Sequence, residues 1–186
     1  MTLTTRRMVP VMAALVMLGV GIRPVHAASA SKISTGANAA LKKLYASNPS
    51  AKILGEKAKA VLVFPSILKA GFIFGAQGGD GAMRKGGKTV GYYRTLAASY
   101  GFQAGIQEFG YALFFMTDSS LSYLNQSKGW EIGTGPSLVI VDEGFAKTLT
   151  STTLTQDVYA FIFDQKGLMA GIGIQGSKIT RIHPGK

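Results

Sequence analysis

The stretch VGYYRTLAASYGFQAGIQEFGYALFFM, residues 90–116, decides the class of fold. Along it, apolar residues alternate with small or polar ones at a period of two, which indicates strands rather than helices. The pattern predicts successive strands over Val90–Thr95, Ser99–Gln107 and Tyr111–Met116. No segment long enough for a crossover helix separates them, so neighbouring strands are expected to pair antiparallel.

Segments on both sides of this stretch have the same period. Upstream, Ala60–Phe64 is an apolar run that Pro65 is expected to stop, because proline is excluded from the interior of a central strand. Lys69–Gly75 follows, and Gly78-Gly79-Asp80-Gly81 is expected to form a turn. Downstream, strands are predicted at Trp130–Gly133, Ser137–Val141, Asp157–Phe163, Leu168–Ile174 and Ser177–Ile182.

Helical spacing of apolar residues is confined to short segments. Ser34–Ala46 is predicted to be a helix capped by Ser34 or Thr35, and Asn48-Pro49 is expected to start a second helix that runs to about Ala60. A short helix over Ser119–Asn125 follows, with Asp118 as its cap. The chain is therefore predicted to be α+β: a mainly antiparallel β sandwich or barrel-like core with N-terminal helices packed on it.

The first residues have the pattern of an export signal. Arg6 and Arg7 precede the uncharged run Met8–Ile22, and Val25-His26-Ala27 ends it with small residues at the first and third places. A membrane anchor is the rival interpretation, but the run is short for a span of about 20 residues. We expect a cleaved signal over residues 1–27, a single domain over residues 28–186, and a periplasmic or secreted product.

Patterns for catalysis and cofactors are weak. Gly171–Gly176 fits G-x-G-x-x-G, but it lies in a predicted strand, and no acidic residue follows at the spacing that a dinucleotide site needs. The chain has no cysteine, and His183 is the one histidine after the signal, so neither a zinc site nor a nucleophile–base pair is indicated. We expect no enzyme activity, no cofactor and no metal.

Charge is distributed unevenly along the chain. Basic residues outnumber acidic ones eleven to two over Lys32–Arg94, a net charge of +9, whereas Thr95–Lys186 carries a net charge of −1. Such an excess favours an anionic partner, and an exported protein rarely meets nucleic acid, so an anionic membrane surface is expected instead. The candidate lipid-binding residues are Lys42, Lys43, Lys52, Lys57, Lys59, Lys69, Arg84, Lys85 and Lys88.

Several short motifs occur in order along the chain, at Ala58–Ser66, Lys69–Phe72, Gly78–Gly81, Ser99–Gly105, Thr134–Pro136, Val158–Phe161, Lys166–Gly171 and Gln175–Ser177. Together these motifs resemble one family, the SYLF lipid-binding domain. The resemblance implies a lipid-binding domain without catalytic residues, because eukaryotic members bind phosphoinositide membranes through a basic, amphipathic N-terminal region. It maps that region onto Lys42, Lys43, Lys52, Lys57, Lys59 and Lys69.

Three hypotheses follow for the function. In the first, this is an exported lipid-binding module, and its compartment would offer phosphatidylglycerol or cardiolipin. Some members of the family bind actin, a role that is not expected to carry over to an exported chain. In the second, the basic face binds an acidic envelope protein or a polysaccharide. The third, an integral outer-membrane barrel, fits poorly with the short strands and the two N-terminal helices.

Overall fold

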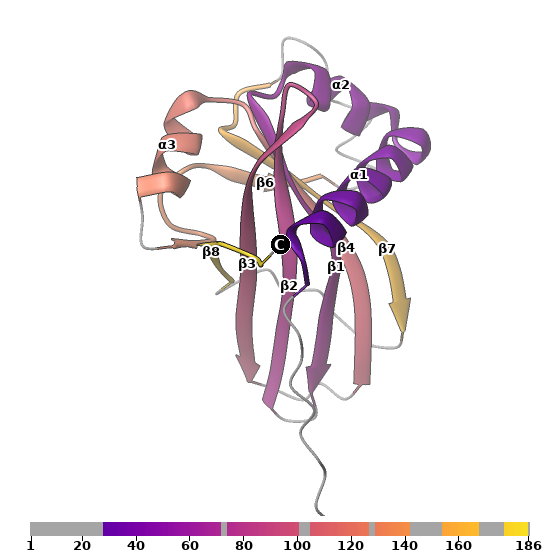
Figure 1. Ribbon diagram of the computed structural model, residues 1–186. Helices are drawn as coiled ribbons and strands as arrows, with labels where there is room; N and C mark the ends of the chain where they lie inside the picture. Colours follow the sequence, from indigo (N-terminus) through magenta and orange to yellow (C-terminus); the bar gives the residue numbers. More distant parts are fainter. Residues whose placement is uncertain are drawn as a thin grey trace, which may run out of the picture.

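The computed structural model describes residues 28–71, 74–100, 105–126, 129–141, 154–167 and 177–185. Within these residues the chain forms three helices and an eight-stranded sheet (Figure 1). The helices are α1 (Ala30–Ser47), α2 (Pro49–Lys57) and α3 (Asp118–Gln126). The strands are β1 (Ala60–Gly71), β2 (Phe74–Lys85), β3 (Lys88–Tyr100), β4 (Gly105–Phe115), β5 (Trp130–Glu131), β6 (Leu138–Ile140), β7 (Val158–Gly167) and β8 (Lys178–Ile182).

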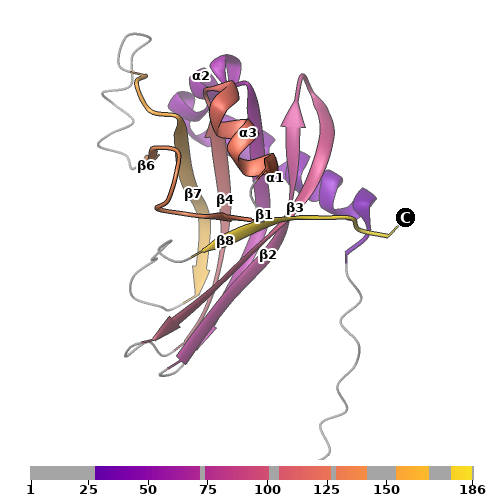
Figure 2. The same cartoon turned by 90° about the vertical axis from the view of Figure 1, so that its left-hand side faces the viewer.

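The sheet has the order β5-β8-β3-β2-β1-β4-β7-β6. All its pairs are antiparallel except the edge pair β6–β7, which is parallel. The sheet is curled into a half-barrel, and α1 and α3 lie on opposite sides of it (Figure 2). The predicted α+β class with a barrel-like core and N-terminal helices is confirmed. No described helix combines the length and the apolar character needed to cross a membrane.

Alternation along the strands builds two cores, one on each face of the sheet. On β1, Leu62 and Phe64 point to the core beneath α3, which also buries Trp130. Val61 and Val63 point to the other core, which α1 and α2 close. The helices α1 and α2 contribute Ile33, Ala37, Leu44, Ala51 and Leu54 to this second core.

Pro65 does not stop β1, contrary to the prediction. The strand continues to Gly71, and its register with both neighbours shifts around Pro65 and Ser66. Pro65 has no N–H to donate to a neighbouring strand. A bulge at this point removes it from the regular hydrogen-bond pattern of the sheet, so a central strand can contain proline. Gly36 of α1 faces the bulge, because a Cβ on it would lie 3.3 Å from Pro65 Cγ.

The predicted turn at Gly78–Gly81 is wrong, since these residues lie inside β2. Gly81 is needed there for packing: a Cβ on it would lie 2.6 Å from Phe64 Cδ1. The turn is instead formed by Gly86 and Gly87, which have φ angles of 55° and 76° and join β2 to β3. Positive φ at both central residues is the requirement of a two-residue hairpin turn.

Other helix and strand boundaries in the structure also differ from the predicted ones. The predicted strand Ser99–Gln107 is divided between the end of β3 and the start of β4, and residues 101–104 lie outside the described part. Ser29, rather than Ser34 or Thr35, caps α1, whereas the predicted cap Asn48 of α2 is confirmed. At α3, the hydroxyl of Thr117 accepts the Ser120 N–H at 3.2 Å, so Thr117 is the cap and Asp118 lies in the first turn.

Some sequence interpretations fall outside the described residues. These are the export signal at residues 1–27, the strand at Leu168–Ile174 and the G-x-G-x-x-G match at Gly171–Gly176.

Candidate functional site

A cavity of about 450 Å³ lies at one end of the sheet, between α1, the end of α2 and the β2–β3 hairpin. Figure 1 shows α2 and this hairpin at the same end of the molecule. Four cationic residues line the cavity: Lys42, Lys59, Arg84 and Lys85. They come from separate elements, and the fold brings them together. We call this cavity the basic pocket.

One face of α1 forms a wall of the basic pocket. Asn38, Leu41, Lys42 and Tyr45 recur at helical spacing and all line it. The Tyr45 side chain packs against α2 at Gly55, which has no side chain to block it. A Cβ on Gly55 would lie 2.0 Å from the Tyr45 hydroxyl oxygen. Burial raises the pKa of Tyr45, and the nearby Glu56 carboxylate raises it further, so the phenol stays protonated at neutral pH.

Arg84 is held in place by its own hairpin. Its Nη1 donates to Thr89 Oγ1 at 2.6 Å, and its Nη2 donates to the Gly87 carbonyl. The Thr89 hydroxyl donates in turn to Ser34 Oγ at 3.2 Å, which connects the hairpin to α1. The guanidinium is therefore oriented before any ligand binds, which reduces the conformational entropy that binding would remove.

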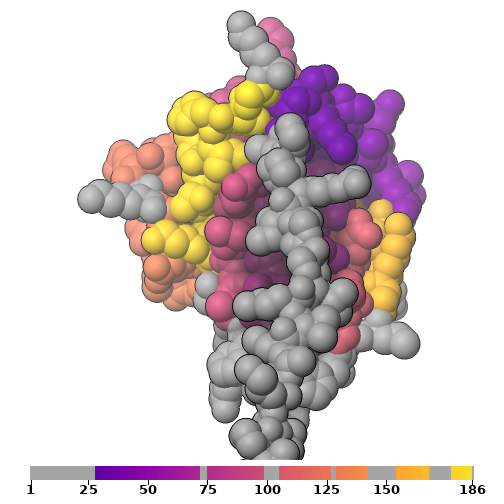
Figure 3. All heavy atoms as spheres, turned by 60° about the horizontal axis from the view of Figure 1, so that its bottom comes forward, coloured from indigo at the N-terminus to yellow at the C-terminus, as the bar shows by residue number. Residues whose placement is uncertain are grey.

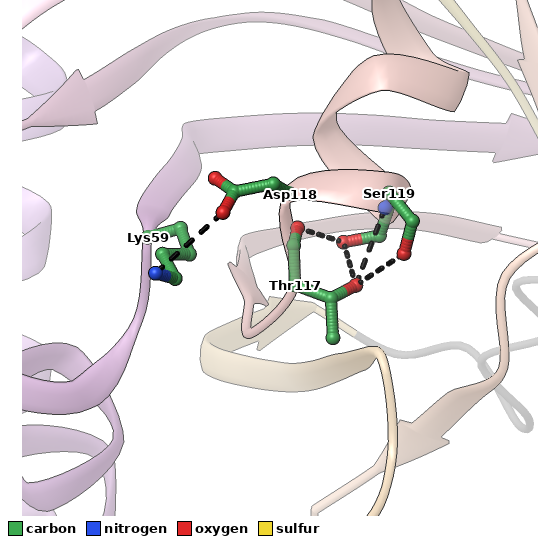
Figure 4. Close-up of polar contacts among 5 residues, drawn as sticks. Lys59, Thr117, Asp118 and Ser119 are labelled. Atoms are coloured by element: carbon green, nitrogen blue, oxygen red, sulfur yellow. Dashed lines mark hydrogen bonds and ion pairs between the residues drawn. The ribbon is translucent and has the colours of Figure 1, made fainter.

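Lys59 is the pocket cation with an acidic partner. Its ammonium lies 3.6 Å from Asp118 at the start of α3, and both side chains are more than half exposed (Figure 4). An exposed pair of this kind is weak, about 0–1 kcal/mol, so an incoming anion can displace it. Within the described part of the chain, no carboxylate lies within 4 Å of Lys42, Arg84 or Lys85. The basic pocket therefore has an excess of positive charge.

The other predicted residues lie away from the pocket lining. Lys43 makes an ion pair with Asp164 of β7 at 2.6 Å. Lys52 and Lys57 are exposed on α2, and Lys88 is exposed at the hairpin, next to the pocket but not lining it. Lys69 departs most from the expectation of a surface residue, because it is only 4% exposed and lies on β1 between Gln77 and Gln107 of the neighbouring strands.

Sequence reasoning missed the uncharged parts of the pocket. Leu41, Tyr45 and Val61 supply apolar surface, and Gly86 and Gly87 complete the rim. Two signals pointed to them. Positions 38, 41, 42 and 45 have the spacing of one helix face, and Lys85-Gly86-Gly87-Lys88 has the composition of a hairpin turn.

Carboxylates elsewhere in the described residues serve the fold. Asp157 accepts hydrogen bonds from the Ser137 N–H and hydroxyl and from Thr117, and these contacts lower its pKa. Asp80 holds Arg94 on the neighbouring strand through two contacts, of 2.6 and 2.9 Å. No group of three His, Cys, Asp or Glu residues that could hold a metal occurs among the described residues.

Comparison with family models tests the predicted resemblance. Residues 96–183 match the Ysc84 model, described as "Las17-binding protein actin regulator", which represents the SYLF domain. The SYLF resemblance is confirmed. The matched SYLF segment runs from the second half of β3 to just beyond β8, whereas the residues that line the basic pocket precede it. A comparison with curated proteins found no match.

Proposed function

We propose that this protein is an exported, non-catalytic module that binds anionic phospholipid headgroups in the basic pocket. The observation that carries the proposal is the convergence of Lys42, Lys59, Arg84 and Lys85 on one cavity. Arginine forms paired hydrogen bonds with phosphate oxygens, and lysines add charge without a fixed geometry. The association of the SYLF family with lipid binding supports the same conclusion.

The mixed lining of the pocket suits a lipid better than a free anion. The ammonium and guanidinium groups would contact the phosphate, while Leu41, Tyr45 and Val61 would contact the glycerol and the first methylenes of an acyl chain. Each basic residue near an anionic surface contributes about 1 kcal/mol. The exposed lysines around the pocket, Lys52, Lys57 and Lys88, would add long-range attraction without defining the site.

Vesicle co-sedimentation tests this proposal. The mature chain should bind vesicles with phosphatidylglycerol or cardiolipin and should not bind phosphatidylcholine vesicles. Binding should weaken at high salt, since the screening length falls from about 10 Å at 0.1 M to about 3 Å at 1 M. Equal binding to neutral and anionic vesicles, with no effect of salt, would rule the proposal out.

A matched pair of variants locates the site. Lys42→Ala with Lys85→Ala removes two pocket charges and should weaken binding by about 2 kcal/mol, or about thirtyfold. Lys52→Ala with Lys57→Ala removes the same charge from α2 outside the pocket and should have a much smaller effect. If both double variants lose the same affinity, diffuse charge and not the pocket holds the protein on the membrane.

A second function is a structural or protein-binding role in the cell envelope. It is favoured by the description of the Ysc84 model, which names a binding protein and a regulator and not a lipid ligand. In that case the basic face would bind an acidic protein or a polysaccharide. Affinity capture from an envelope extract, in lipid-free detergent, would recover one specific partner, and the Lys42/Lys85 double variant would lose it.

Export itself is part of the proposal. Arg6, Arg7 and the run Met8–Ile22 support a signal cleaved after Ala27. The intact mass of protein recovered from the periplasm or the medium should correspond to a chain beginning at Ala28. Recovery of the uncleaved chain from the cytoplasmic fraction alone would contradict it.

A further inference from the structure

A second cavity, of about 350 Å³, lies at the same end of the sheet as the basic pocket. It is enclosed by the start of α3, by the parts of β2 and β3 next to their hairpin, and by β8. Its lining includes Lys85, Tyr93, Asp118, Leu121, Asn125 and Arg181. We call this cavity the α3 pocket.

The α3 pocket and the basic pocket lie on opposite faces of the sheet. Tyr93, in the α3 pocket, belongs to the core beneath α3, whereas Val61, in the basic pocket, belongs to the core beneath α1. Figure 2 shows α3 and α1 on the two sides of the sheet. Ala60 and Lys85 line both pockets. The pockets therefore meet at the end of the sheet, with the exposed Lys85 between them.

Arg181 is the second cation of the α3 pocket. It is paired with Tyr93 across β8 and β3, the yellow and magenta strands in Figure 3. Its Nη2 lies 3.6 Å from where a Cβ of Gly91 would be, so the guanidinium extends along the sheet toward the hairpin that carries Lys85. Within the described part of the chain, neither Arg181 nor Lys85 has a carboxylate within 4 Å. Both cations are thus available to an anion at this end of the sheet.

The polar wall of the α3 pocket is formed by Tyr93 and Asn125. The Tyr93 hydroxyl donates to Asn125 Oδ1 at 2.8 Å. Burial raises the pKa of Tyr93, although Arg181 opposes this shift, so at neutral pH the phenol keeps the proton that it donates. Because its oxygen accepts this hydrogen bond, the Asn125 amide has its N–H groups left as donors. The pocket therefore offers an amide, an ammonium and a guanidinium group to a phosphate.

Asp118 is the acid of the α3 pocket. Its carboxylate lies 3.6 Å from the ammonium of Lys59, which lines the basic pocket (Figure 4). This pair crosses the boundary between the pockets and leaves Arg181 and Lys85 without an acidic partner. Five cationic residues and one acidic residue line the two pockets together, which gives a net charge of +4. Such an excess suits more than one phosphate.

Apolar side chains line the α3 pocket as well. Met83, Val90 and Leu121 form this part of the lining, and Val90 is 49% exposed. The basic pocket has the same combination of cations and apolar surface. Each pocket therefore matches one phosphatidyl group, which consists of a phosphate, a glycerol and two acyl chains.

We propose that the two pockets together bind one lipid in which two phosphatidyl groups are joined by a glycerol, the structure of cardiolipin. Each pocket takes one phosphatidyl group, and Lys85 lies between the two phosphates. This inference rests on the proposed lipid function and specifies the class of lipid. Because the two phosphates are linked, binding of the first makes binding of the second intramolecular, which raises the affinity.

Other anionic lipids fill the two pockets less completely. A lipid with one phosphate, such as phosphatidylglycerol, occupies one pocket and leaves the other empty. A lipid with several phosphates on one headgroup has a single pair of acyl chains, so the apolar part of the other pocket stays in water. The pair of pockets therefore favours two linked phosphodiesters, each with its own apolar chains.

Vesicle co-sedimentation at matched composition tests the proposal. Phosphatidylcholine vesicles contain either cardiolipin or twice as many molecules of phosphatidylglycerol, so that the anionic phosphates and their acyl chains are equal in number. The anionic fraction is kept low, because two phosphatidylglycerol molecules then rarely lie side by side. The mature chain should bind the cardiolipin vesicles at least about fivefold more tightly. Equal affinity for the two would overturn this inference and leave the proposed function standing.

Arg181→Ala tests the α3 pocket. It should lower the affinity for cardiolipin vesicles about fivefold, the effect of one basic residue near an anionic surface, and should lower the affinity for phosphatidylglycerol vesicles less. Lys178→Ala is the matched control, because Lys178 is an exposed cation of the same strand that lines neither pocket. The control should keep the preference for cardiolipin. Equal losses in the two variants would overturn the inference, since charge on β8 in general would then be responsible.

Soluble ligands separate the lipid from phosphate in general. In a calorimetric titration, the deacylated headgroup of cardiolipin should bind more tightly than glycerol phosphate, and Arg181→Ala should remove the difference. Equal affinities for the two soluble ligands would contradict a site for two linked phosphates. If the headgroup binds as expected but neither kind of vesicle does, the ligand is a soluble one and the membrane function is wrong. Circular dichroism verifies that both variants are folded.

Discussion

At the scale of single residues, the wall of the basic pocket depends on the contact between Tyr45 and Gly55. The tyrosine ring lies between α1 and α2, and its centroid is 6.4 Å from that of the buried Phe114. Gly55 has no intrinsic advantage within a helix, where glycine costs about 1 kcal/mol relative to alanine. Its presence is explained by the space that Tyr45 occupies.

We therefore predict opposite effects of Gly55→Ala in two backgrounds. In the wild type the new methyl group would displace the Tyr45 ring, so the substitution should lower the free energy of unfolding by about 1 kcal/mol despite the better helix propensity. In a Tyr45→Ala background it should instead raise stability by about 1 kcal/mol. Urea unfolding of the four proteins gives the coupling energy. Additive effects would show that the two residues do not compete for space.

Prediction from sequence succeeded at this scale where the signal was local. Asn48 caps α2 as expected, because its side chain needs only the N–H of Ala51, three residues away. The choice of cap for α1 failed, since Ser29, Ser34 and Thr35 all have suitable side chains. Ile33 packs in the core beneath α1, so the helix begins before Ser34, at Ala30.

At the scale of elements, the β2–β3 hairpin determines the geometry of the pocket. It carries Arg84 and Lys85, and the carbonyl of Gly87 accepts a hydrogen bond from Arg84. A Cβ on Gly86 or Gly87 would meet no atom within 4 Å, so steric contact places no limit on either position. Only the backbone conformation requires glycine there.

This predicts a graded effect at Gly86. Asparagine adopts positive φ readily, so Gly86→Asn should leave stability and vesicle binding close to those of the wild type. Gly86→Val should cost about 1–2 kcal/mol, because a β-branched residue is strained at a φ of +55°. Thermal unfolding and vesicle co-sedimentation measure the two effects. If Gly86→Asn and Gly86→Val lose the same stability and the same vesicle binding, a cause other than the φ angle excludes side chains from this turn.

The strands illustrate why elements were only partly predictable. Periodicity identified the strand cores, but the glycine cluster at Gly78–Gly81 predicted a turn where β2 is continuous. Glycines there admit Phe64 and the Ser66 carbonyl from β1, contacts between residues distant in sequence. A period-two pattern contains no information on such a close approach. From sequence alone, a glycine cluster is therefore compatible with a turn and with a strand that packs closely against its neighbour.

At the scale of the whole molecule, the core beneath α3 joins distant parts of the chain. Trp130 of β5 is 1% exposed, and its ring centroid lies 5.9 Å from that of Phe115 at the end of β4. Its indole N–H donates to the Thr134 carbonyl at 2.9 Å. The sequence contains a single tryptophan, so its fluorescence reports this core alone.

We predict that tryptophan fluorescence and far-ultraviolet circular dichroism follow one unfolding transition in urea. The core around Trp130 extends through β1, β4, β7 and β8, so the sheet cannot lose it and remain folded. Trp130→Ala should lower stability by about 3–5 kcal/mol. Separate midpoints for the two signals would show that the β5–β8 edge unfolds independently of the helices α1 and α2.

The amino-acid sequence by itself determined the class of fold, the strand-rich core and the segment that carries the positive charge, because periodicity and composition are local properties. It did not determine which lysines act together. Lys42 and Lys85 meet at the basic pocket, while Lys69 is buried at the other end of the sheet. Only strand register and helix packing decide that separation, since both depend on contacts between residues far apart in the chain.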